Sequence, residues 1–124
     1  MPKASERGAV AVEFAILAPV LIMILLGIME FGRAYNAQIS LTNAAREGVR
    51  VMAVSNNQTL ARTAAKNAAV SLSPGLADTN IAFSAANCVT NAQMTVTVTY
   101  TLSTLTGIAG PFSMTGRGVM LCGG

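Results

Sequence analysis

Residues 9–29 read AVAVEFAILAPVLIMILLGIM, and this stretch decides the fold. Its only charged residue is Glu13. At a rise of about 1.5 Å per residue, an α-helix of this length reaches roughly 30 Å, which is the thickness of a bilayer's hydrocarbon core. The whole chain has 124 residues, of which 52% are hydrophobic and only 10% are charged, and this balance is unusual for a freely soluble small domain. The sequence therefore predicts a transmembrane helix segment over residues 9–30.

The helical pattern continues beyond the apolar stretch. Apolar residues recur at spacings of roughly three and four, as on one face of an amphipathic helix: Ile39, Leu41, Ala45, Val49 and Met52. Arg46 and Arg50 share another face. We therefore predict one long helix over residues 9–54, with an amphipathic continuation at residues 31–54.

Residues 55–124 predict a small domain that completes an α+β fold. Ser55-Asn56-Asn57 breaks the first helix and offers capping oxygens for a second, short helix over residues 58–72. Its predicted apolar stripe consists of Leu60, Ala64, Ala68 and Leu72. Residues 94–102, MTVTVTYTL, then alternate with the period of a β-strand. Weaker signals at residues 81–85 and 112–122 complete a small antiparallel C-terminal sheet.

The two cysteines, Cys88 and Cys122, have no metal-binding spacing. One interpretation is a disulfide between the first and last strands, which requires an oxidising compartment. Closing a loop of about 35 residues would stabilise so small a domain by about 3 to 4 kcal/mol in the chain-entropy model. The other interpretation is a pair of reduced, partly buried thiols.

The composition argues against catalysis and nucleic-acid binding. The chain has no histidine, no phosphate-binding loop and no recognisable nucleophile, so we expect no enzyme activity, no metal and no cofactor. Its net charge is +3, but the basic residues are scattered and there is no tryptophan, so we expect no nucleic-acid partner. Basic residues on both sides of the apolar stretch leave the orientation in a membrane undetermined.

Three interpretations of residues 1–30 compete. A secretory signal peptide would need a shorter apolar core and a small-residue cleavage site. A plain single-span anchor would keep Glu13 near the membrane interface. In the third interpretation the chain is cut between Gly8 and Ala9, so that Ala9 becomes the N-terminus and Glu13 its fifth residue.

The third pattern resembles the class III signal sequences of type IV pilins and pseudopilins. More narrowly, the chain resembles the TadE family of pilus assembly proteins over about residues 7–54. The resemblance is carried by three stretches and Pro19: GAVAVEFA at residues 8–15, GIMEFGR at residues 27–33 and LTNAAREGVR at residues 41–50.

This resemblance implies a pseudopilin or minor pilin that helps to assemble a Tad (Flp, tight-adherence) pilus in adhesion and biofilm formation. A prepilin peptidase would remove the leader, residues 1–8, and Glu13, followed by Phe14, would meet the terminal amine of a neighbouring subunit. Implied partners are the membrane, the peptidase, other pilin subunits and the Tad machinery, without a small-molecule substrate. The protein would cross the inner membrane once and hold residues 55–124 in the periplasm as a small α+β domain. Incorporation into the extracellular filament stays open.

The alternative function is a single-span anchor that displays a small envelope binding module. Two charged groups are candidates for contacts with partners. Glu30 and Arg33 form either an interfacial pair or a solvated helix face, and Arg46 and Arg50 either contact a partner or form an ordinary charged face.

Overall fold

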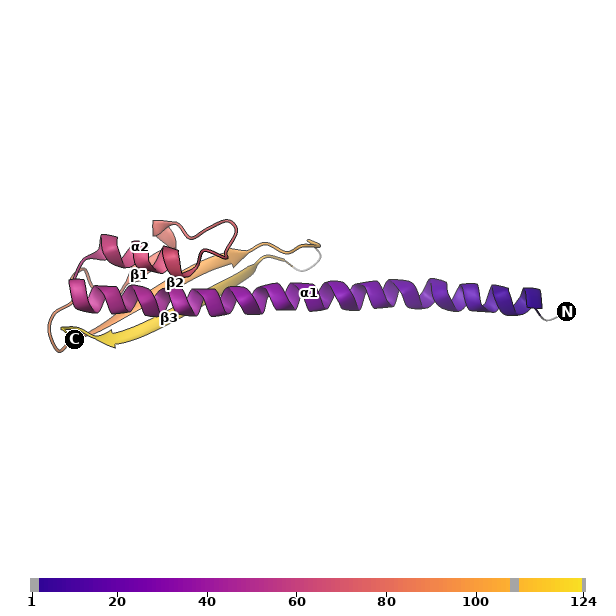
Figure 1. The fold of residues 1–124 in the computed structure, drawn as a ribbon, viewed down its shortest axis with the longest axis horizontal. Helices are drawn as coiled ribbons and strands as arrows, with labels where there is room; N and C mark the ends of the chain where they lie inside the picture. Colours follow the sequence, from indigo (N-terminus) through magenta and orange to yellow (C-terminus); the bar gives the residue numbers. More distant parts are fainter. Residues whose placement is uncertain (1–2, 108–109, 124) are drawn as a thin grey trace. The chain divides into compact units, whose positions relative to one another are not determined.

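The computed structural model describes residues 3–107 and 110–123 and has the predicted α+β architecture (Figure 1). A long N-terminal helix and a second short helix precede a three-stranded antiparallel sheet. In chain order the elements are α1 (Lys3–Ser55), α2 (Gln58–Ala68), the 3₁₀ turn η1 (Asp78–Asn80), β1 (Ile81–Phe83), β2 (Gln93–Leu102) and β3 (Phe112–Leu121).

Helix α1 is longer than predicted at both ends. It begins at Lys3 instead of Ala9, because the leader contains no helix-breaking residue after Pro2 and places Glu6 in the first turn, where a negative charge suits the helix dipole. It ends at Ser55, immediately before Asn56, whose φ of 49° lies in the left-handed region. Asparagine is one of the few residues that adopts this conformation readily.

The chain divides into two compact units, Met1–Arg33 and Ala34–Gly124. The first unit is the apolar part of α1. The second unit contains the remaining turns of α1 together with α2 and the sheet, so about two fifths of the long helix belongs to the C-terminal core.

The buried face of α1 in the second unit follows the predicted three- and four-residue spacing, with one exception. Its fully buried or nearly buried side chains are Ala37, Leu41, Ala44, Ala45, Val49, Met52 and Ala53. The prediction that Ile39 belongs to the buried face is wrong, since 45% of its surface is exposed. At about 100° per residue, Ile39 lies some 200° around the helix from Leu41 and therefore faces outward.

The buried stripe of α2 lies one residue away from the predicted one. Ala61 and Ala65 are completely buried, whereas 53% of Leu60 is exposed. The cause is the closeness of the two helices: a β-carbon added to Gly48 of α1 would lie 3.3 Å from Cβ of Ala65. Only small side chains fit between helix backbones that approach so closely, so the alanines face inward and Leu60 is turned away.

Helix α2 also ends at Ala68 instead of Leu72. Ala69 leaves the helical region at φ −122° and ψ 37°, and its N–H bonds the carbonyl of Lys66. A turn then carries the chain to Leu72, which is still buried because the turn folds back towards the core.

Strand β2 is the centre of the sheet and shows the predicted alternation. One face is buried and consists of Met94, Val96, Val98, Tyr100 and Leu102. The first strand is shorter than predicted and ends at Phe83. At the next position the N–H of Thr95 donates to the side-chain Oγ of Ser84, at 3.0 Å, in place of a backbone carbonyl. Strand β2 begins at Gln93, and β3 ends at Leu121 instead of residue 122.

Strand β3 packs on α1 through two glycines. Gly116 pairs with Val98 and Gly118 with Val96, so both lie on the buried face of the sheet. A β-carbon on Gly116 would collide with the backbone of Leu41, and one on Gly118 would come within 2.7 Å of the carbonyl oxygen of Ala45. The missing side chains let the strand lie directly against the helix backbone.

Candidate functional site

The predicted cleavage point lies within the first turns of α1. Gly8 and Ala9 are helical and exposed, and a β-carbon on Gly8 would meet nothing within 4 Å. The structure therefore leaves the Gly8–Ala9 peptide bond accessible from solvent in the first unit.

Glu13 follows Ala9 by four residues on the same helix, so the two residues share one face and are separated by about 6 Å along the axis. Glu13 is exposed, and 71% of the neighbouring Phe14 is exposed as well. A terminal amine created at Ala9 would thus lie on the same side of the helix as the Glu13 carboxylate.

The segment that follows exposes large apolar side chains around the whole helix. Those with half or more of their surface exposed include Val12, Ile16, Leu17, Leu21, Ile24, Leu25 and Ile28. Helix α1 is long and apolar enough to cross a membrane, and none of its most apolar window is buried within the protein. Exposed apolar area of this extent is costly in water and favourable in a bilayer.

Glu30 and Arg33 form an ion pair at the end of the apolar segment. Arg33 Nη1 lies 3.9 Å from Glu30 Oε2, and only 9% of Glu30 is exposed. The two side chains are therefore paired, and a contact of this pair with a partner stays a prediction.

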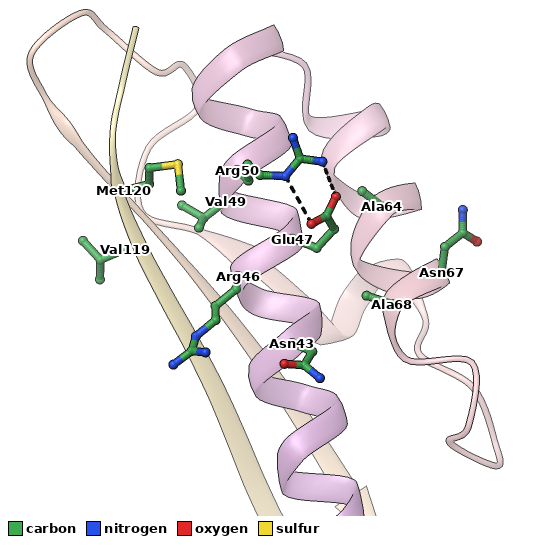
Figure 2. Close-up of a pocket in the computed structure, with 10 residues that line it drawn as sticks. All are labelled: Asn43, Arg46, Glu47, Val49, Arg50, Ala64, Asn67, Ala68, Val119 and Met120. Carbon is green, nitrogen blue, oxygen red and sulfur yellow. Dashed lines mark hydrogen bonds and ion pairs between the residues drawn. The ribbon is translucent and has the colours of Figure 1, made fainter. Parts of the chain in front are cut away.

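Arg46 and Arg50 border an open hollow of about 970 Å³ on the second unit, and they behave differently (Figure 2). Arg50 donates from Nε to Glu47 Oε2 at 3.2 Å and makes a second bond from Nη2 to Oε1. These bonds lower the pKa of Glu47 and raise that of Arg50. Arg46 instead extends towards β3. The two arginines predicted as contact residues therefore lie in different surroundings.

A further ion pair was not foreseen from the sequence. Lys66 Nζ lies 2.7 Å from Asp78 Oδ1 and joins the end of α2 to the turn η1. The hydrogen bond from Lys66 lowers the pKa of the Asp78 carboxyl. The two residues are separated by an irregular segment of the chain, so the periodicity of the sequence could not predict that they meet.

A disulfide joins Cys88 and Cys122. Cys88 lies in the loop between β1 and β2, and Cys122 follows β3 directly. Two hydrogen bonds hold the same region to the end of α1: Cys88 N–H donates to Asn56 Oδ1 at 2.6 Å, and Gly123 N–H donates to the carbonyl of Ala53 at 3.2 Å. The sulfur bridge and these bonds fasten the C-terminal end of the sheet.

Among the residues that the structure describes, no three His, Cys, Asp or Glu side chains gather into a group that could hold a metal ion. The site residues predicted from the sequence are the leader junction at Gly8 and the carboxylate of Glu13, at the start of the apolar segment.

Comparison with known proteins identifies the same part of the chain. Residues 8–50 match the family model described as TadE-like protein. No curated protein and no solved structure matches the chain. The family match confirms the resemblance found in the sequence and covers the junction, Glu13, the apolar segment and most of the buried face of α1.

Proposed function

We propose that this chain, with its TadE-like residues 8–50, is a pseudopilin or minor pilin that takes part in assembling a Tad (Flp) pilus or a related secretion system. The observation that carries the proposal is the position of Glu13. This lone carboxylate lies one helical turn after a Gly8–Ala9 junction, at the start of an exposed apolar helix.

Cleavage after Gly8 gives Glu13 a function. A carboxylate inside a membrane costs about 2.5 to 3.5 kcal/mol at mid-depth on insertion scales, so it is normally paired. The amine of Ala9 on a neighbouring subunit supplies the opposite charge. Pairing of the two groups favours subunits that are inserted side by side at the correct depth.

The apolar segment holds the protein in the bacterial inner membrane as a single span, and the C-terminal domain faces the periplasm. The Cys88–Cys122 disulfide supports this orientation, because disulfides persist in oxidising compartments. From the membrane the subunit is available to a prepilin peptidase, to other pilins and to the Tad machinery. Its role in these contacts is structural rather than catalytic.

Intact-mass measurement tests the proposal. The full-length chain is expressed with and without its cognate prepilin peptidase, and the expected result is loss of residues 1–8 only when the peptidase is present. Gly8→Val serves as the control, because a branched side chain at the cleavage point should block processing while the apolar segment still inserts.

The alternative, a membrane anchor that displays an envelope binding module, predicts a full-length mature chain under both conditions. Unprocessed protein in cells with an active prepilin peptidase would refute the pseudopilin proposal in favour of this anchor. The apolar segment alone fits both functions.

A further inference from the structure

Strand β3 lies at an edge of the sheet, since the strand order is β1-β2-β3. The hydrogen bonds of β2 show which backbone groups of β3 point away from the sheet. Thr95 bonds Ser84 through both its N–H and its carbonyl, so its backbone groups point away from β3. Thr95 is paired with Val119, and backbone directions alternate along an antiparallel ladder. The N–H and carbonyl groups of Arg117, Val119 and Leu121 therefore point away from β2, towards the outer side of the sheet.

Two hydrogen bonds agree with this direction and mark the ends of the free stretch. Gln38 Nε2 donates to the carbonyl of Thr115 at 2.9 Å, and Gly123 N–H donates to the carbonyl of Ala53. Both bonds connect odd-numbered residues of this segment to α1. Between them, in the described part of the chain, the outward N–H groups of residues 117, 119 and 121 donate no hydrogen bond and their carbonyls accept none. We call residues 117–121 the open edge.

Two arginines flank the open edge on opposite faces of the sheet. Arg46 extends from α1 towards β3 on the buried side (Figure 2), where a β-carbon on Gly118 would lie 3.0 Å from the backbone nitrogen of Arg46. Arg117 pairs with Thr97 and is exposed on the other face. Within the described residues neither guanidinium forms an ion pair. In contrast, both acidic side chains of the second unit form ion pairs, Glu47 with Arg50 and Asp78 with Lys66.

We propose that the open edge binds an extended, acidic segment of another protein by strand addition. The segment would continue the sheet beyond β3 through main-chain hydrogen bonds, as in other cases of β-augmentation. A second copy of this chain is a poor occupant, because it would bring four arginines together and its acids are already paired. This proposal concerns the C-terminal unit and goes beyond pilus assembly.

The geometry also defines the acidic pattern. Successive side chains of a strand point to opposite faces of the sheet. A carboxylate facing Arg46 and one facing Arg117 must therefore occupy adjacent positions of the bound segment. The apolar side chains of Val119 and Leu121, each at least half exposed, provide contact area for β-branched neighbours of that acidic pair.

The test uses isotope-labelled full-length chain in detergent micelles and three capped hexapeptides. The acidic peptide has the order Thr-Val-Asp-Glu-Val-Thr, and the other two replace its central pair by Asn-Gln or by Lys-Lys. We expect the acidic peptide to shift the amide signals of Arg117, Val119 and Leu121 and to slow their hydrogen exchange. Arg46→Gln and Arg117→Gln should each weaken binding about two- to fivefold, as expected for exposed ion pairs.

Val119→Pro removes one outward N–H and should abolish binding, while the ladder with β2 remains, because proline is tolerated on edge strands. Val119→Ala keeps that N–H and should bind the acidic peptide within twofold of the original chain. Arg62→Gln is the matched charge control, since Arg62 lies over Phe83 of β1 at the other end of the strand order, and it should also change binding less than twofold.

Three results would overturn the proposal. The first is absence of any response to the acidic peptide at millimolar concentration, and the second is an equal response to all three peptides. The third is self-association of the chain that Val119→Pro abolishes, because the occupant would then be a second copy.

Discussion

Gly118 of β3 lies against the backbone of Ala45 in α1, so closely that an added β-carbon would come within 2.7 Å of the Ala45 carbonyl oxygen. Gly116, two residues earlier on the same face of β3, approaches the backbone of Leu41 in the same way, so the strand meets the helix at both glycines. The neighbours are backbone atoms, which cannot move aside as a flexible side chain does.

Replacing Gly118 by alanine should therefore destabilise the second unit. We expect a loss of about 1 to 3 kcal/mol, the usual cost of overpacking a well-filled interior, measured by chemical unfolding of the protein in detergent. Gly75→Ala is the matched control, since nothing lies within 4 Å of its β-carbon position, and it should change stability by less than about 0.5 kcal/mol. Equal stability of both variants would contradict the close packing.

Neutralising Glu13 should separate processing from assembly. We expect Glu13→Gln to be processed normally but to reduce surface pili about tenfold or more, because even 1.4 kcal/mol of lost pairing shifts an equilibrium by that factor. Intact mass measures the first effect and electron microscopy of the cells measures the second. Phe14→Leu is the control, since it changes the adjacent side chain but no charge. Normal piliation of Glu13→Gln would indicate that Glu13 merely lies in the headgroup region.

Removing the disulfide should destabilise the C-terminal unit without changing its fold. Cys88→Ala combined with Cys122→Ala opens a loop of about 35 residues and should cost about 3 to 4 kcal/mol in the chain-entropy model. Denaturant unfolding measures the loss, and intact mass before and after reduction reports the bond itself. If reduction leaves the mass unchanged, the cysteines are not bonded in the isolated protein.

Acid should weaken the Lys66–Asp78 pair. The hydrogen bond from Lys66 lowers the pKa of Asp78 in the folded protein, so its contribution to stability is present above the ordinary aspartate pKa of about 4 and is lost as the pH falls through the lower folded value. Asp78→Asn should therefore reduce the slope of stability against pH below about 4. An unchanged slope would mean that the exposed pair contributes nothing measurable.

The sequence predicted the order and type of the elements because their periods are long and clean. The nine-residue alternation around Val98 identified β2, and the apolar stretch at residues 9–29 identified the membrane-like helix. Helix faces were less certain. Ile39 and Leu60 are large and apolar, yet both face outward. Ile39 lies on the side of α1 away from Leu41, and Leu60 is turned away because Gly48 and the alanines of α2 bring the helices too close for large side chains.

At the candidate site, a short stretch of sequence predicts Gly8, Ala9 and Glu13, since their relationship is local to one helix turn, and their roles stay predictions. The different environments of Arg46 and Arg50 were not predictable in the same way. The pair of Arg50 with Glu47 is local to α1, whereas the surroundings of Arg46 depend on β3, which lies some 70 residues later in the chain, and on two glycines whose significance becomes visible only where Leu41 and Ala45 meet them.

The division of α1 between two units has a practical consequence for work on the isolated C-terminal part. A water-soluble fragment trimmed at the predicted end of the long helix, near Ser55, would lose Leu41, Val49 and Met52 and would expose the inner surface of the sheet to solvent. A fragment that begins near Ala34 retains these side chains and leaves out the exposed apolar turns of α1. Recombinant production of this region for crystallisation should therefore start inside the helix.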